Sequence, residues 1–227
     1  MSRTTVEPSA TSARRSVPTT SRTWAWTGVV AGVLGLATIQ ASLAASVDWE
    51  KTQGDAGAML SDAAGKQATF LVFHVLAAAC AVVIPVFAAG LKRRIDQRVP
   101  DGSLHGTVAA WGLVLVSVAL LLGSGLDTQF SLALSDPSTL VPESAAFYTD
   151  WVATIPWLWL GAGLSGVAVA VAATRHSAVP RWIGAVSIVL GGLTLILGLS
   201  PLQYMAGFTG PVWLLVVALG FALGDRR

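Results

Sequence analysis

The stretch "FLVFHVLAAACAVVIPVFAAGLKRR", Phe70–Arg94, joins a long apolar run to a basic end. An α-helix rises about 1.5 Å per residue, so about 20 apolar residues cross the hydrocarbon core of a bilayer. The stretch therefore predicts a transmembrane helix, and the basic residues from Lys92 onward predict its cytoplasmic end. The same stretch contains His74, an ionisable ring, and Cys80, the only cysteine in the chain. An ionisable side chain inside a span costs free energy, which makes His74 a candidate functional position.

The composition of the whole chain indicates a polytopic membrane protein. Hydrophobic residues make up 54% of the 227 residues and charged residues 11%, and the mean hydropathy is +0.68. A soluble domain carries about 25% charged residues. The segment from Trp182 to Gly224 contains no Asp, Glu, Lys or Arg, and it is too long for one span, so it must fold back as a hairpin. The lipid bilayer is thus the expected partner, and the basic residues lie in short clusters typical of topology signals rather than nucleic-acid binding.

Six apolar segments predict an all-α fold, a six-helix transmembrane bundle over residues 24–224. The predicted spans are 24–47, 68–91, 104–126, 151–174, 182–202 and 207–223. Residues 1–23, rich in Ser, Thr, Pro and Arg, predict a disordered basic cytoplasmic tail, and residues 225–227 a cytoplasmic end. An alternative remains open at "ASLAAS", because cleavage of a signal peptide after Ala44 would leave five spans.

The basic residues also predict the orientation of the bundle. With the N-terminus inside, every Lys and Arg except Lys51 and Lys66 falls in an inner segment, and most acidic residues fall outside. An excess of Lys and Arg in cytoplasmic segments is the usual orientation signal. Both termini are therefore predicted to be cytoplasmic, in a multi-pass protein of a bacterial plasma membrane.

The C-terminal stretch "HSAVPRWIGAVSIVLGGLTLILGLSPLQYMAGFTGPVWLLVVALGFALG", His176–Gly224, resembles a family of small six-span integral membrane proteins of unknown function found widely in high-GC bacteria. The resemblance lies in Pro180-Arg181-Trp182 before a Gly-rich span, a short outer turn, and Pro211 and Trp213 at the start of the last span. It extends over residues 24–224. It implies the six-helix fold and no particular chemistry.

No catalytic residue, metal site or cofactor is predicted. The motif Gly163-Leu164-Ser165-Gly166 lies in the fourth of six spans, as in rhomboid proteases, but the sixth span lacks the histidine that would activate the serine. We interpret the motif as close helix packing through small residues. His105 and His176 lie at the inner ends of their spans, far in depth from His74, so a shared metal or haem is not expected.

Five polar residues share the outer half of the predicted bundle. They are Gln40, His74, Ser124, Asp127 and Thr154. Gln40 and His74 both lie about 10 Å below the outer ends of their spans. Polar groups in spans usually face the bundle interior, and Pro156 and Pro211 can kink two spans at this level. We hypothesise a polar outer vestibule that binds a ligand, where His74 meets Gln40, Ser124 or Asp127; the alternative is that neighbouring backbones satisfy each group separately.

These features predict a non-enzymatic binding or accessory membrane subunit. One alternative is a small transporter or channel, although no acid is expected deep in a span and no inverted repeat is evident. A second alternative is an outer-leaflet enzyme acting on a lipid or quinone, with His74 and Asp127 as its acid–base pair. A membrane-protein partner, or a homodimer through Gly-rich helices such as those with Gly28-x-x-x-Gly32 and Gly220-x-x-x-Gly224, is also open.

Overall fold

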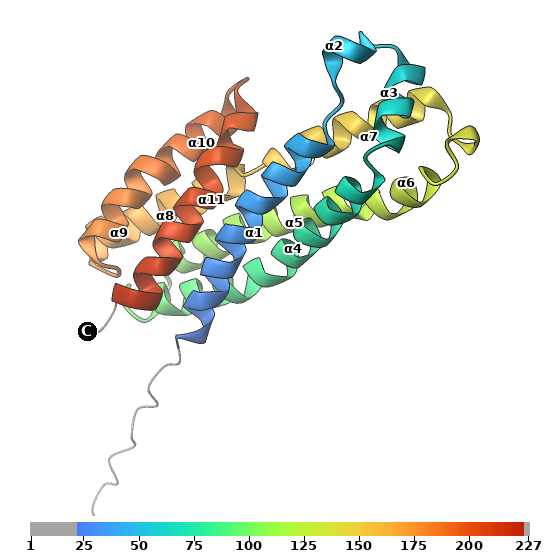
Figure 1. Ribbon diagram of the computed structural model, residues 1–227. Helices are drawn as coiled ribbons and strands as arrows, with labels where there is room; N and C mark the ends of the chain where they lie inside the picture. The colour runs from blue at the N-terminus through green and yellow to red at the C-terminus, as the bar shows by residue number, and fades with distance from the viewer. Residues whose placement is uncertain (1–21, 225–227) are drawn as a thin grey trace, which may run out of the picture.

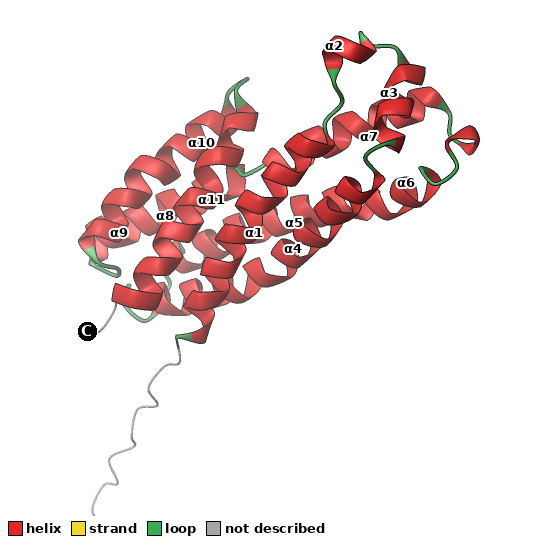
Figure 2. Cartoon of the chain, viewed as in Figure 1, coloured by secondary structure: helices red, strands yellow, loops and turns green. Residues whose placement is uncertain are grey.

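In the computed structural model, which describes residues 22–224, the chain folds as a bundle of helices joined by short connections (Figures 1 and 2). Six helical segments in this range are long and apolar enough to cross a membrane, and the range contains no strand. The prediction of an all-α six-helix membrane bundle is confirmed. The predicted tail up to residue 21 and the end at 225–227 lie outside the described residues.

The spans are formed by one or more helical segments each. The first three are α1 (Thr23–Ala45), α4 (Gln67–Asp96) and α5 (His105–Gly125), and the fourth contains α8 (Leu160–His176). The fifth joins α9 (Arg181–Val186), the π-helical turn η3 (Ser187–Gly191) and α10 (Gly192–Leu199). The sixth runs from the 3₁₀ turn η4 (Gln203–Met205) through α11 (Ala206–Leu219) into the π-helical turn η5 (Gly220–Gly224).

The six spans pack in sequence order and close on themselves. Each packs against its neighbour in the chain, and α11 returns to pack against α1 (Figure 1). The Arg22 guanidinium donates a hydrogen bond to the Ala222 carbonyl over 3.3 Å, so both ends of the described chain lie on one side of the bundle. We call this side the terminal end and the opposite side the cap end. Two chain ends on one side follow from an even number of spans.

The cap end carries a second layer of short helices, which form in the two long connections between the predicted spans. The first connection folds into α2 (Trp49–Thr52) and α3 (Ala56–Ala64), and the second into α6 (Asp127–Ala133), the turn η1 (Pro137–Thr139) and α7 (Pro142–Thr154). Asp48 is the N-cap of α2 and Asp55 the N-cap of α3, because their carboxylates accept hydrogen bonds from free backbone N–H groups of the first turn. We call α2, α3, α6, η1 and α7 together the cap.

The cap has its own apolar core. Phe130 and Tyr148 stack with ring centroids 3.8 Å apart, and Phe70 of α4 meets Phe130 edge-on at 5.8 Å. Alanine and leucine side chains from α3 and alanines from the C-terminal end of α1 belong to the same cluster. Burial of these side chains fixes α6 and α7 on the cap end of α4, which places the polar groups of these helices next to the bundle.

Proline acts differently in the two spans where a kink was predicted. The fourth span is interrupted by the 3₁₀ turn η2 (Ile155–Trp157) and the bend at Leu158, because Pro156 lacks the N–H that a continuous helix needs. Residues 151–154 of the predicted span therefore belong to α7, and α8 begins only at Leu160. In the sixth span, by contrast, α11 continues through Pro211.

Small residues bring the helices into close contact. Gly112 of α5 lies directly against the backbone of Gly161 of α8, and the Ser165 hydroxyl donates a hydrogen bond to the Ala109 carbonyl over 2.6 Å. Ser165 therefore has the packing role that its motif was predicted to have. Gly28 and Gly32 face Phe87 and Leu215 of the same chain, so this Gly-x-x-x-Gly face is used within the bundle rather than exposed to a second copy.

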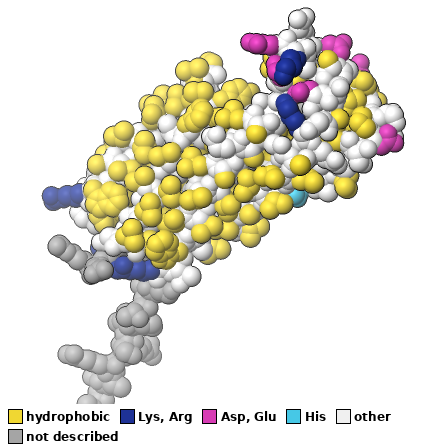
Figure 3. All heavy atoms as spheres, in the orientation of Figure 1, with side chains coloured by type: hydrophobic (Ala, Val, Ile, Leu, Met, Phe, Trp, Pro, Cys, Tyr) yellow, Lys and Arg dark blue, Asp and Glu magenta, His cyan; other side chains and the backbone are white. Residues whose placement is uncertain are grey.

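The outer surface matches a membrane environment. Large apolar side chains point outward around the spans, for example Val82 at 70% exposure and Leu199 at 72%. Figure 3 shows hydrophobic side chains over the visible face of the bundle, with basic side chains at the terminal end and, at the cap, acidic side chains together with a few basic ones. The chain is thus a multi-pass membrane protein. The charge difference between its two ends supports the predicted orientation, which stays a prediction.

Candidate functional site

Two polar sites lie at the cap end, on opposite sides of α7. The first, the Asp127 cluster, consists of His74, Ser124, Asp127 and Tyr148. The Asp127 side chain has no exposed surface, and the Tyr148 hydroxyl donates a hydrogen bond to its Oδ1 atom. Its Oδ2 atom lies 3.6 Å from Nδ1 of His74. A carboxyl group from α6 is thus held between a ring from α4 and a phenol from α7.

The hydrogen bonds of His74 define its tautomer. Nδ1 lies 3.0 Å from the Ser124 carbonyl oxygen, which can only accept a hydrogen bond. Nδ1 therefore carries a proton in both charge states of the ring, and Nε2 is the atom that gains or loses one. The His74 side chain is 31% exposed, whereas Asp127 is fully buried, so the histidine connects the buried carboxyl to the surroundings.

Local structure explains why these groups meet. One residue, Leu126, separates the end of α5 at Gly125 from Asp127, the first residue of α6, and the turn at Leu126 directs Asp127 back toward α4. Tyr148 is held by its stacking on Phe130, which leaves its hydroxyl at the carboxyl group. Tyr148 was not among the predicted site residues, because it lies in the connection between two predicted spans and carries no spanning or motif signal.

Asp127 is also incompletely paired. Among the described residues, its buried Oδ2 atom has no hydrogen-bond partner, since the His74 nitrogen is too distant. A buried carboxylate without a close donor is costly. A proton on Asp127, or a movement of the His74 ring to within hydrogen-bond distance of Oδ2, reduces this cost.

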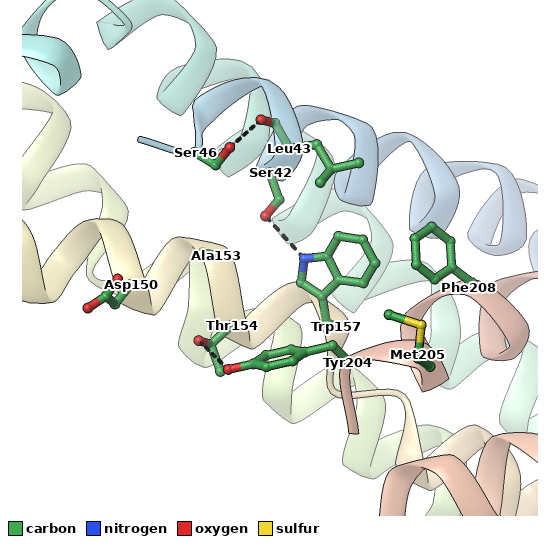
Figure 4. Close-up of a pocket in the computed structure, with 10 residues that line it drawn as sticks. All are labelled: Ser42, Leu43, Ser46, Asp150, Ala153, Thr154, Trp157, Tyr204, Met205 and Phe208. Atoms are coloured by element: carbon green, nitrogen blue, oxygen red, sulfur yellow. Dashed lines mark hydrogen bonds between the residues drawn. The ribbon is translucent and has the colours of Figure 1, made fainter. Parts of the chain in front are cut away.

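The second site, the lateral cavity, is an open pocket of about 610 Å³ between α1, α7, η2, η4 and the start of α11 (Figure 4). Its lining combines apolar and polar side chains: Ser42, Leu43, Ser46, Asp150, Ala153, Thr154, Trp157, Tyr204, Met205 and Phe208. This size falls in the range of about 300–1,000 Å³ that small-molecule sites occupy.

Hydrogen bonds hold the wall of the lateral cavity in place. The Trp157 indole N–H donates to the Ser42 hydroxyl over 3.4 Å, and that hydroxyl donates to the Val152 carbonyl over 2.9 Å. The hydroxyl oxygens of Thr154 and Tyr204 lie 3.3 Å apart. In Figure 4 the Trp157 ring lies between α1 and the residues of η4 and α11. The break at Pro156 is what turns Trp157 out of the helix line and into this wall.

The five residues predicted to form one vestibule are divided by the structure. His74, Ser124 and Asp127 come together in the Asp127 cluster. Thr154 lines the lateral cavity instead. Gln40 is exposed on α1 and belongs to neither site. A ligand-binding role for these residues stays a prediction.

The other two histidines meet at the terminal end. The rings of His105 and His176 lie with centroids 5.2 Å apart, and the His105 ring is hydrogen bonded to Ser103. Over residues 22–224, no group of three or more His, Cys, Asp or Glu side chains is arranged to hold a metal ion. The two histidines therefore form a local contact that is remote from both sites at the cap end.

Comparison with protein families, curated proteins and solved structures found no match for this chain. The predicted membership of a six-span family stays a prediction. Any functional conclusion must therefore come from the geometry of the two sites.

Proposed function

We propose that this chain is a non-enzymatic binding subunit of a bacterial plasma membrane, and that the lateral cavity holds a single-chain amphiphile from the outer leaflet. The observation that carries the proposal is the cavity itself, because it joins an apolar wall to a polar rim at the level of the cap. An acyl chain fits beside Trp157 and Phe208, and a headgroup fits beside Thr154 and Tyr204.

The charge around the cavity selects the headgroup. Asp150 is the only ionisable acid in its lining, and no basic residue lines it. Most acidic residues of the spans and connections lie at the cap end, where Lys51 and Lys66 pair with Asp48 and Asp62. Like charges repel in a medium of low dielectric constant. An uncharged or cationic headgroup is therefore favoured over an anionic one.

Binding is favoured over catalysis for a chemical reason. The cavity lining offers hydroxyl groups and one carboxylate, but it includes no histidine, cysteine or lysine that could serve as an activated nucleophile or a general base near neutral pH. The His74–Asp127 pair, the acid–base pair required by an outer-leaflet enzyme, does not line the cavity. An accessory role with a membrane-protein partner is compatible with this proposal.

Photo-crosslinking tests the proposal. The purified protein in nanodiscs is irradiated with a monoacylglycerol that carries a diazirine in its acyl chain, and the labelled peptides are identified by mass spectrometry. We expect labels on the segments around Leu43, Trp157 and Phe208, and weaker labelling by the diazirine fatty acid of the same length, because its carboxylate is anionic.

A cavity-filling variant provides the matched comparison. Ala153→Phe places a ring in the cavity and is expected to reduce labelling at least tenfold, whereas Ala185→Phe adds the same ring on an exposed face of α9 and leaves labelling unchanged. Both variants are checked for unchanged thermal stability. Labels spread evenly around the spans, or equal labelling of the two variants, would rule out the lateral cavity as a binding site.

A further inference from the structure

The helix α7 connects the two outer sites. Its 13 residues run from Pro142 to Thr154, and successive side chains are rotated by about 100° around a helix. Relative to Tyr148, the cavity residues Ala153, Asp150 and Thr154 are rotated by about 140°, 200° and 240°. One face of α7 therefore contacts the Asp127 cluster, and the opposite face forms a wall of the lateral cavity.

Asp127 is buried between groups that come from three helices. The titratable groups that face Asp127 are His74 from α4 and Tyr148 from α7, and Ser124 of α5 offers only its backbone carbonyl. When His74 and Asp127 together hold one exchangeable proton, the cluster is either an ion pair or a neutral pair. When that proton leaves, a buried carboxylate remains beside an uncharged ring, which is strongly unfavourable.

We propose that this single proton, shared by His74 and Asp127, controls ligand binding in the lateral cavity through the position of α7. With the proton bound, the cap packs on the bundle and the cavity has its wall. On deprotonation the proton leaves from Nε2 of the partly exposed ring, while Nδ1 keeps the proton that it donates to Ser124. The carboxylate then gains free energy by reaching water, so α6 and α7 loosen and the cavity loses one side.

The sign of the pH effect follows from this cycle. The state that binds the amphiphile holds one proton more than the loosened state. Ligand affinity is therefore high while the proton is bound and falls as pH rises through its loss, by at most about tenfold per pH unit for one linked proton. This inference rests on the proposed function for its ligand, but not for the protonation of the cluster.

Two measurements on the full chain test the inference. The first is the affinity of the uncharged monoacylglycerol from about pH 5 to 8, the range in which histidine changes charge in proteins. The second is hydrogen exchange of the α6 and α7 amides over the same range, without ligand and corrected for the intrinsic pH dependence of exchange. We expect affinity and protection of α7 to fall together as pH rises, while α4 and α5 stay protected.

Substitutions identify the group responsible. Asp127→Asn keeps the shape of the side chain and cannot become charged, so both measurements should lose their fall at high pH and stay near the high-affinity level. Asp136→Asn removes an exposed carboxylate of the same connection and should retain the pH dependence. Tyr148→Phe should loosen α7 at every pH but keep a pH response, because the histidine and the carboxyl group remain.

The outcomes separate the two proposals. In one outcome no monoacylglycerol binds, but the protection of α7 depends on pH in the native chain and not in Asp127→Asn. The control of α7 by the shared proton is then supported, and the proposed function is wrong. If the monoacylglycerol binds with an affinity independent of pH, the proposed function stands and the inference is overturned. Retention of the native pH response by Asp127→Asn would also overturn it.

Discussion

Replacing Tyr148 with Phe removes one hydroxyl group and leaves the ring that stacks on Phe130. The lost hydrogen bond goes to a fully buried carboxyl group, and its Oδ2 atom already lacks a partner among residues 22–224. Hydrogen bonds to charged groups contribute about 1.5–3 kcal/mol. We therefore expect Tyr148→Phe to lower the free energy of local opening of α6 and α7 by about 2 kcal/mol.

Hydrogen exchange measures this free energy directly, because protected amides exchange through local opening. A loss of about 2 kcal/mol corresponds to about 30-fold faster exchange. Tyr204→Phe is the matched control, since Tyr204 is 47% exposed and its hydroxyl faces only Thr154 at 3.3 Å. It should change exchange by less than about threefold, consistent with the small effect of most surface substitutions. Equal effects of the two substitutions would refute the reasoning that Asp127 depends on Tyr148.

Three further predictions concern the cap and the topology. Phe70→Ala should destabilise the cap by about 3–5 kcal/mol because it empties a fully buried site, whereas Val75→Ala on the exposed face of α4 should change it by less than about 0.5 kcal/mol, both by hydrogen exchange. His74→Gln should retain more of the α6–α7 protection than His74→Leu, since only the amide can donate to the Ser124 carbonyl. A reporter fused after Arg98 should be cytoplasmic and one after Asp62 external; the reverse result would invert the predicted orientation.

The candidate site was only partly accessible to prediction. Depth along a span can be counted from the sequence at about 1.5 Å per residue, and this correctly grouped His74 with Ser124 and Asp127. Depth is only one coordinate, however. Gln40 was assigned the same depth as His74 but is exposed on α1, because the rotation of a helix about its axis depends on packing with its neighbours.

The composition and hydropathy of the sequence were sufficient to determine the six-helix membrane bundle. In hydrocarbon every backbone polar group must be satisfied within its own helix, so a local apolar run is enough to specify each span. Six spans, an even number, also predicted that the two chain ends lie on one side of the bundle. The hydrogen bond between Arg22 and Ala222 agrees with this prediction.

Only the tertiary structure decided what the polar connections do. The segments at 48–67 and 127–150 gave no spanning signal, yet they fold into a cap because Phe70, Phe130 and Tyr148 bury one another across a long sequence separation. That packing sets the rotation of α7, which turns Tyr148 to Asp127 and Thr154 to the lateral cavity. Contacts between residues far apart in the chain leave no local periodicity, and for this reason the division into two sites could not be derived from the sequence.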